Sequence, residues 1–393
     1  MEIDDIDRST PFPWELGVFD AHCHPTDTMA SINDIPSMKA RTLAIMATRA
    51  QDQELVAQVA SKLLDPDLTD PSNREESQPD RKVIPCFGWH PWFSHQLFDD
   101  LNSTQNKDID KIEHYKSVLT PSIQDEHLLD DLPNPRPLST FIRETRQHLL
   151  TYPHALVGEI GLDRAFRIPN AWFPHEISNR DSSRTPGSRE GRTLSPYRVQ
   201  LSHQKAILKA QLQLAGELQR PVSIHSVQAH GAVLQVLQDL FKGYEKPVVS
   251  KRQRKRRGSV EGAHDGESED ALDSSRREAG DSPLPFPPRI CMHSYSGPVE
   301  PLRQFLHPSS PADVYFSFSN VINFSNGPAS KVVEVLKGIP DDRILVESDL
   351  HCAGPKMDDM LEVITRSLCE IRGWGLEEGV NKLGKNWKTF ING

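Results

Sequence analysis

Six residues of types that bind metals stand at or near the downstream end of short apolar runs. The set holds four imidazoles and two carboxylates: His22, His24, Glu159, His225, His293 and Asp349. Taken singly, each is more often a hydrogen-bonded core or surface residue than a ligand. A random chain would rarely deliver all of them from separate runs, so the joint pattern predicts a site for two divalent metal ions.

The spacing suggests how the ligands divide between two ions. His22 and His24 are two residues apart, so in extended chain they point to the same side and can share one metal. Glu159 lies between Gly158 and Gly161, and we expect these glycines to let the backbone pass close to a metal. A carboxylate at Glu159 can bridge two cations, which would make it a central catalytic residue.

The remaining ligands complete the two sets. His225 and His293 are expected on the second metal, and Asp349 on the first, where it would also orient a water molecule for catalysis. Imidazole ligands suit Zn or Mn, while Mg prefers oxygen but stays open. Two such ions about 3.5–4 Å apart stabilise a hydrolytic transition state and lower the pKa of a water.

Elements at regular intervals must carry these ligands to one place. Short runs that are apolar throughout predict parallel strands buried on both faces, near 17–21, 42–47, 83–88, 155–159, 221–225, 289–293, 313–318 and 343–348. Helical patterns alternate with them at 51–63, 138–150, 196–218, 228–241, 298–306, 329–338, 357–372 and 376–390. In the third of these helices, Ser195 is a plausible cap and Pro196 suits the first turn. This alternation predicts an α/β fold, a (β/α)8 TIM barrel whose active site collects strand ends.

The chain has 393 residues, and one such barrel usually takes about 250. Four polar stretches account for the excess, so a single domain over 1–393 with long polar loop insertions is favoured over two domains. The insertions lie at 65–81, 99–135, 168–195 and 244–288. The last is predicted to be disordered, because low hydrophobicity and charge blocks cannot offset the ordering entropy.

Composition excludes several classes of protein. No apolar stretch approaches the length of a membrane span, and the acidic N-terminus lacks a secretory signal. Five sparse cysteines indicate reduced thiols and an intracellular location. The net charge of −10 disfavours a broad nucleic-acid-coating surface. The basic run 251–257, KRQRKRR, suggests nuclear import or a nucleic-acid tether, although a solvated charge-balanced loop is the alternative; nucleus and cytoplasm both remain open.

The chain resembles the TatD family of metal-dependent deoxyribonucleases, within the amidohydrolase-like barrels, and its decorated form is similar to the fungal branch. An ordered series of motifs carries the resemblance: DAHCH at 20–24, GWHP at 88–91, VGEIGLD at 157–163, QKAILKAQLQLAGELQRPVSIHS at 204–226, MHSYSG at 292–297, FSFSNVINF at 316–324 and RILVESD at 343–349. Single pieces are common, but the series spans nearly the whole chain outside the insertions.

The resemblance implies a TIM barrel with two divalent cations and hydrolysis of phosphodiester bonds in DNA, typically from a 3′ end. It assigns His22, His24, Glu159 and Asp349 to one metal, and Glu159, His225 and His293 to the other. It places His90 near the substrate, where we expect a phosphate contact. Asp163 is expected to support the site from outside the ligand set, and Asp20 to orient His22 or to be structural.

The rim departs from the family pattern. Val227 and Gln228 stand where the family usually carries Arg and Asp, and 350–352, Leu-His-Cys, replace a small residue, Pro and an aromatic. The metal ligands are therefore retained while the substrate rim differs. Two other functions stay open: an amidohydrolase-type enzyme acting on a small ester, amide or lactone, and a barrel scaffold whose insertions bind a protein partner. The sequence does not distinguish DNA from RNA, nor does it indicate the oligomeric state.

Overall fold

The computed structural model describes residues 8–63, 82–101, 109–187, 189–248, 283–325 and 329–393. The insertion 65–81 lies outside the described residues, as do the basic run 251–257 and most of the insertion 244–288. Disorder in that insertion and nuclear import through the basic run therefore stay predictions.

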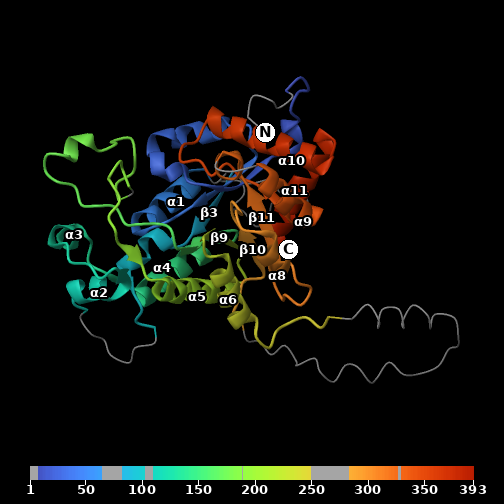
Figure 1. Cartoon of the computed structure of the whole chain (residues 1–393). Coiled ribbons are helices and arrows are strands. Elements are labelled where there is room, and N and C mark those ends of the chain that lie inside the picture. Colours follow the sequence, from blue (N-terminus) through green and yellow to red (C-terminus); the bar gives the residue numbers. More distant parts are fainter. Residues whose placement is uncertain (1–7, 64–81, 102–108, 188, 249–282, 326–328) are drawn as a thin grey trace, which may run out of the picture.

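Eight parallel strands form one sheet that curls into a nearly closed barrel, which confirms the predicted TIM-barrel fold (Figure 1). Their spatial order follows their order in the chain. They are β1 (Phe19–Cys23), β2 (Thr42–Met46), β3 (Val83–Phe87), β7 (Leu156–Asp163), β9 (Val222–Val227), β10 (Arg289–Met292), β11 (Asp313–Phe318) and β12 (Ile344–Val346).

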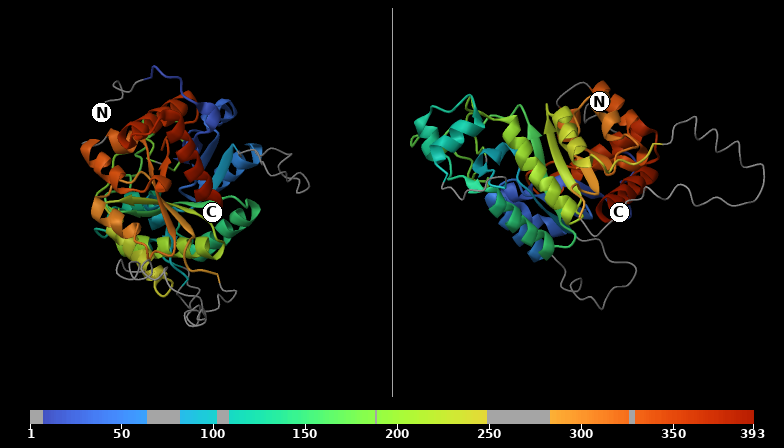
Figure 2. Two further views of the ribbon diagram at one scale, coloured as in Figure 1. Left: turned by 90° about the vertical axis from the view of Figure 1, so that its right-hand side faces the viewer. Right: turned by 90° about the horizontal axis from the view of Figure 1, so that it is seen from below.

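Helices follow the strands and cover the outside of the barrel, as the two views of Figure 2 show. They are α1 (Ala50–Leu63), α4 (Leu138–Thr151), α5 (Leu201–Glu217), α6 (His230–Phe241), α8 (Val299–Phe305), α9 (Ala329–Gly338), α10 (Pro355–Arg372) and α11 (Leu376–Asn392). Short 3-10 segments include η3 (Pro25–Ser37) after β1 and η6 (Pro91–Gln96) after β3. The helix ranges agree with the sequence pattern within a few residues, with one exception.

That exception is the start of α5. The sequence pattern placed it at Pro196 with Ser195 as the cap, whereas the helix begins at Leu201. Arg198 and Val199 instead form the short strand β8 (Arg198–Val199), which pairs with β5 (Leu119–Thr120) of an insertion. Ser195 accepts a hydrogen bond from the Tyr197 amide 3.2 Å away in this extended segment. Tertiary pairing has therefore overridden the local helical signal.

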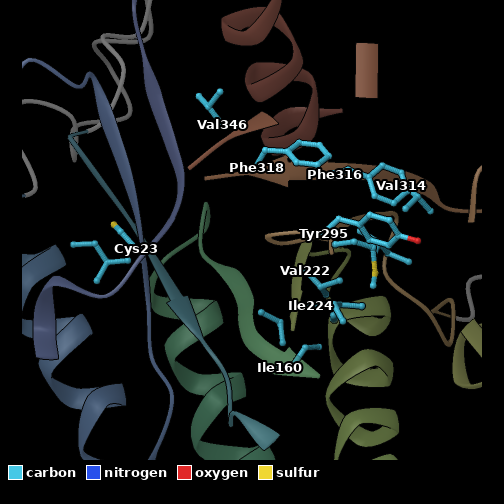
Figure 3. Packing of buried hydrophobic residues seen from close by; sticks show 14 of the residues in the cluster. Cys23, Ile160, Val222, Ile224, Tyr295, Val314, Phe316, Phe318 and Val346 are labelled. Atoms are coloured by element: carbon cyan, nitrogen blue, oxygen red, sulfur yellow. The ribbon is translucent and has the colours of Figure 1, made fainter. Parts of the chain in front are cut away.

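Two apolar layers hold the barrel together. The larger packs the outer faces of the strands against the helices, and Figure 3 shows part of it, with Ile160 of β7 near Val222 and Ile224 of β9. A second cluster joins alternate strand residues to Trp387 and Phe390 of α11 and fills the barrel's interior. Each fully buried aliphatic or aromatic side chain stabilises the fold by roughly 1.5–3 kcal/mol.

Part of the insertion 99–135 is folded rather than a loop. It contains α2 (Lys111–Val118) and α3 (Glu126–Asp131), which lie on the left in Figure 1, far from the C-terminal helices α10 and α11. Tyr115, Leu128 and Leu132 pack against Ile168 and Ala171, the latter pair from the insertion 168–195. The two insertions therefore share a small apolar core beside the barrel, which their polar average composition concealed.

Candidate metal centre

The interior faces of the strands lead directly to the predicted ligands. Side chains alternate along a strand, so inward-facing apolar positions predict the faces of the residues that follow. Cys291 inside the barrel is followed two residues later by His293, and Leu345 is followed by Glu347 and then Asp349. The bottom of the barrel is thus apolar and its C-terminal mouth carries the polar side chains.

Glu159 lies at the middle of this mouth and brings the four predicted histidine ligands together. Its Oε2 atom lies 3.5 Å from His22 Nε2 and 3.3 Å from His24 Nε2. Its Oε1 atom lies 2.9 Å from His225 Nδ1 and 2.8 Å from His293 Nε2. One carboxylate oxygen therefore faces each histidine pair. β7 continues to Asp163, so Glu159 lies inside the strand. The sequence pattern had placed it at the end of the strand.

Asp349 joins the first pair from the last strand end. Its Oδ1 atom lies 3.6 Å from His24 Nε2. Its backbone amide donates to the His22 carbonyl at 3.0 Å, and the His24 amide donates to the Leu350 carbonyl at 2.8 Å. These bonds close the barrel between β1 and β12. Asp349 has φ 54°, a left-handed conformation that costs a non-glycine residue roughly 1–3 kcal/mol and is typical of functional sites.

A second group of polar side chains holds the outer nitrogens of the histidines. His22 Nδ1 lies 2.8 Å from Ser223 Oγ, and His225 Nε2 lies 3.1 Å from Asp163 Oδ2. His293 Nδ1 lies 3.5 Å from Glu347 Oε1. The two hydrogen bonds fix which nitrogen of His22 and of His225 faces the mouth, as outer partners do in metal sites, whereas His293 Nδ1 makes only the longer ion contact.

Glu347 and Ser223 were missed in the sequence. Strand periodicity could have found both, because Glu347 precedes Asp349 by two residues and Ser223 precedes His225 by two. Glu347 is fully buried, and Ser294 Oγ donates a hydrogen bond to its Oε1 atom. With His22 and His293 it forms a further group of buried residues close enough to hold an ion.

Gly161 lies where β7 packs closely against β9, and the metal-side role expected for it stays a prediction. It has φ 150°, and a Cβ atom placed there would lie 2.0 Å from the His225 carbonyl oxygen. The glycine therefore allows β7 to approach β9 closely enough for Glu159 and His225 to meet.

His90, predicted to contact substrate, lies beside the same carboxylate. Its Nε2 atom is 3.1 Å from Glu159 Oε1, and its Nδ1 atom accepts a hydrogen bond from the Trp92 amide at 3.1 Å. Because Nδ1 is an acceptor, the proton of the neutral ring sits on Nε2. In this hydrogen-bonding pattern His90 offers a donor at the mouth, while with Glu159 and His225 it also forms a buried group close enough to hold an ion.

Asp163 and Asp20 take different supporting positions. Asp163 contacts His225 as described, and its Oδ1 atom accepts from the amides of Ala165 and Phe166. Asp20 does not touch the imidazole of His22. Its Oδ1 atom accepts from the His22 amide at 3.1 Å and the Ser348 amide at 3.0 Å, so it clamps β1 to the end of β12.

Burial and charge act against each other within the cluster. Burial raises the pKa of Glu159, but the imidazoles of His90, His293 and His22 outweigh it and hold the pKa well below its usual range. Burial lowers the pKa of His293, but Glu159 and Glu347 outweigh it and raise the pKa well above normal. For His24, burial dominates and the pKa falls well below normal. Without a metal ion, the cluster thus favours an ionised Glu159 beside a protonated His293 and a neutral His24.

The donor set fits divalent ions. Two donors that share one ion at about 2.1 Å in tetrahedral geometry lie about 3.4 Å apart. The separations here match: 3.1 Å between the Nε2 atoms of His22 and His24, and 3.2 Å between His225 Nδ1 and His293 Nε2. Neutral imidazoles and carboxylates packed this closely and buried are the ligands that Zn and Mn prefer.

The altered rim has its own contacts. His351 Nδ1 lies 2.8 Å from Asp27 Oδ2, and its ring stacks on His24 at 5.5 Å. Arg49 Nη1 lies 3.6 Å from Asp27 Oδ1. His351, from the segment that departs from the family pattern, therefore joins Asp27 and Arg49 in a polar chain beside the first histidine pair.

Comparison with known proteins places this architecture in a family. A family model described as TatD related DNase matches residues 19–392.

None of the helices in the described ranges is both long and apolar enough to cross a membrane.

Two curated fungal proteins are similar over most of their length. The Cut9-interacting protein scn1 of Schizosaccharomyces pombe is 36% identical over 375 residues, covering 95% of this chain and 98% of that protein. An uncharacterized deoxyribonuclease, YMR262W, of Saccharomyces cerevisiae is 25% identical over 344 residues, covering 86% and 84%.

Solved structures share the fold at low identity. An uncharacterized amidohydrolase from Saccharomyces cerevisiae superposes with a TM-score of 0.53 at 13% identity, covering 95% of this chain and 99% of that one. A hydrolase of the TatD family from Entamoeba histolytica gives 0.51 at 12% identity, covering 96% and 98%.

Proposed function

The chain belongs to the TatD related DNase family, and on that premise we propose that it hydrolyses phosphodiester bonds in DNA with two divalent metal ions. Family membership supports a hydrolase of the deoxyribonuclease type. The binuclear site, the substrate and the residue roles below are our proposal.

One observation carries it: the two oxygens of Glu159 face separate histidine pairs. Oε2 lies toward His22 and His24, and Oε1 lies toward His225 and His293, all within 3.5 Å. A carboxylate shared in this way is suited to bridge two ions. Asp349 completes the first set beside His24.

The ions, when bound, would supply positive charge for the phosphoryl oxygens and increase the acidity of a water. The protein's own groups would do the rest. Asp349 would orient the attacking water and accept its proton on the carboxylate. His90 would donate its Nε2 proton in a hydrogen bond to a phosphate oxygen, because its Nδ1 is engaged by the Trp92 amide. Asp163 and Glu347 would hold the rings of His225 and His293.

The test compares purified wild-type protein with Glu159→Gln. Both are assayed on single-stranded DNA and on bis-p-nitrophenyl phosphate, in Mg, Mn and Zn. Glu159→Gln should lose more than about 100-fold in kcat/KM, since even outer partners of metal ligands are worth about 10–100-fold. Glu370→Gln, an exposed carboxylate on α10, is the matched control and should keep wild-type rates. Equal rates for wild type and Glu159→Gln contradict the proposal.

A small ester or amide substrate is the alternative for the same metal centre. The altered rim at 350–352 is the observation that keeps it open. Rates on p-nitrophenyl acetate and on DNA, measured with the same preparation, separate the two. Hydrolysis of the ester alone would replace the nuclease proposal.

A protein partner is a second proposed role, which does not exclude catalysis. The relative that is 36% identical is named a Cut9-interacting protein. The folded insertions at 109–135 and 168–195 give this chain a surface beyond the barrel. Affinity purification of Glu159→Gln from cells should recover the same partners as wild type, whereas loss of the partners would tie them to catalysis.

A further inference from the structure

A cavity of 610 Å³ lies beside the barrel mouth, and we call it the side pocket. Four segments wall it: the start of α1 at 49–51, the segment 89–96 that includes η6, the segment 128–136 from α3 onward, and the insertion between 168 and 192. Its volume is in the range of about 300–1,000 Å³ typical of ligand sites. Most of its wall comes from the insertions and not from the barrel.

The lining combines cations with aromatic rings. Four arginines reach the side pocket against two carboxylates: Arg49, Arg136, Arg180 and Arg192 against Asp131 and Glu190. All four guanidiniums are ion-paired, Arg49 with Asp52 at 3.0 Å, so the wall offers N–H donors and not a net positive charge. Trp92 and Trp172 contribute indole rings, and Trp92 is 36% exposed. Such mixtures of guanidinium and aromatic groups bind nucleobases and phosphates.

The arginines of the wall are ion-paired in this structure. Arg192 lies 3.6 Å from Asp131, and Arg180 pairs with Glu190. Arg136 lies 2.8 Å from Glu144 at the surface. A guanidinium carries five N–H donors, so the single carboxylate contact of Arg136 leaves donors for a further anion.

Trp92 connects the side pocket to the metal centre. Its Nε1 atom donates to Asp163 Oδ2 at 2.6 Å, and that same oxygen contacts His225. Its ring lies edge-on to His90 at 4.7 Å and stacks on Phe166 at 4.5 Å. An extended ligand bound at the metal centre would therefore reach the side pocket by passing Trp92.

The outer wall is fixed to the barrel. Thr185 Oγ1 donates to the Thr26 carbonyl at 2.6 Å, and the Thr185 amide donates to the Asp27 carbonyl at 2.9 Å.

Two buried atoms of lining residues, Arg49 Nε and His95 Nδ1, have no hydrogen-bond partner within the described part of the chain. Both atoms are buried behind the wall and do not face the space of the side pocket.

From this geometry we propose that the side pocket holds the nucleotides next to the phosphodiester bond at the metal centre, as part of a single-stranded polynucleotide. Bases would stack on Trp92 and Trp172, and the arginines would contact the phosphates. The bases must be unpaired, because an indole can stack only on an open base face. This inference rests on the proposed function and assigns the insertions a role in binding the substrate strand.

The test measures binding separately from cleavage. A fluorescent single-stranded DNA of about 12 nucleotides, and the RNA of the same sequence, are each titrated with the full-length protein in EDTA. Trp172→Ala should weaken binding about 10-fold, because stacking one base contributes that order of affinity. Arg136→Ala should weaken it a few-fold and reduce the dependence on salt by about one counterion. Trp374→Ala and the exposed Arg143→Ala are the matched controls and should bind as wild type does.

Two substrates then separate this inference from the proposed function. For Trp172→Ala, the ratio of kcat/KM on the oligonucleotide to kcat/KM on bis-p-nitrophenyl phosphate should fall about 10-fold, since the small diester does not reach the side pocket. Binding that depends on Trp172 in a protein without hydrolytic activity would support the side pocket and refute the hydrolase. Hydrolysis and binding unaffected by Trp172→Ala, in a variant with wild-type thermal stability, would overturn the side pocket. Binding of an acidic peptide but neither oligonucleotide would overturn it as well.

Discussion

The Nε1 atom of Trp92 and the Nε2 atom of His225 both contact one oxygen, Oδ2 of Asp163, at 2.6 and 3.1 Å. This shared contact directs His225 Nδ1 toward Glu159, 2.9 Å away. Trp92 of η6 thus helps to orient a predicted metal ligand on β9.

Replacing Asp163 with Asn should weaken metal binding. Asn keeps an oxygen for the amides of Ala165 and Phe166, but its NH2 group can donate to His225 and favour the wrong tautomer. We expect metal affinity or turnover to fall about 10–100-fold, as for other outer partners of metal ligands. Metal titration by calorimetry measures the effect.

Trp92→Phe and Asp239→Asn complete that experiment. Trp92→Phe removes one hydrogen-bond donor to Asp163 and should lower the metal affinity only a few-fold. Asp239 is an exposed carboxylate on α6, and its Asn variant should match wild type. Full affinity in Asp163→Asn would mean that His225 is oriented by Glu159 alone.

Glu347 should matter in the same way for His293. Its Oε1 atom lies 3.5 Å from His293 Nδ1 and also accepts from Ser294 Oγ. In Glu347→Gln, Ser294 can keep its bond to the remaining oxygen, while the carboxylate that attracts the His293 proton is lost. Metal affinity should again fall about 10–100-fold, whereas Glu370→Gln should be unaffected. An unchanged affinity would assign Glu347 a purely structural role.

Removing the metals should destabilise the protein. Ions that bind only the folded state at 100 times their Kd add about 2.7 kcal/mol of stability. For a chain of this length that corresponds to about 3 °C in Tm. EDTA should lower the Tm of wild type, and added Zn or Mn should restore it. Glu159→Gln should show a much smaller shift. A wild-type Tm that does not respond to EDTA or to added ions would argue against tight metal binding.

His90→Gln should separate substrate contact from metal binding. Because the His90 proton is on Nε2, replacing His90 should leave the metal content at the wild-type value. Turnover on DNA should fall about 10- to 100-fold, the scale of one donor to a charged oxygen. Elemental analysis beside steady-state rates decides the matter, and a variant that loses metal together with activity would make His90 a ligand after all.

Much of this site was accessible from the sequence because the C-terminal parts of the strands, and the residues just after them, carry it. The apolar runs located all eight strands, and the predicted ligands, which lie in these strands or just after them, converge at one mouth as in a parallel barrel. The contact between Asp163 and His225 was not accessible, because it depends on the register that pairs Gly161 with His225 across β7 and β9. The side pocket was hidden for another reason: Leu128 and Ile168 meet only after two polar insertions fold together.

His95 should make stability depend on pH without any part in catalysis. It is buried at the edge of the side pocket near His114 and His203, and burial, followed by these two imidazoles, lowers its pKa to about 3. Its unfolded pKa is about 6.5, so between these values the unfolded state binds more protons than the folded state. The stability that the neutral ring contributes is therefore present above pH about 6.5 and is lost as pH falls toward 3, by about 2 kcal/mol at pH 5. His114 and His203 also have lowered pKa values from burial and act in the same direction.

His95→Gln should flatten this dependence, because the amide does not titrate. Urea unfolding of wild type between pH 5 and 7 should show a loss of stability at low pH that is about 2 kcal/mol smaller in the variant. The exposed residue His307 provides the matched control, and His307→Gln should follow the wild-type curve. Parallel curves for wild type and His95→Gln would mean that the folded protein accommodates a proton on His95, which would require a partner for its Nδ1 atom.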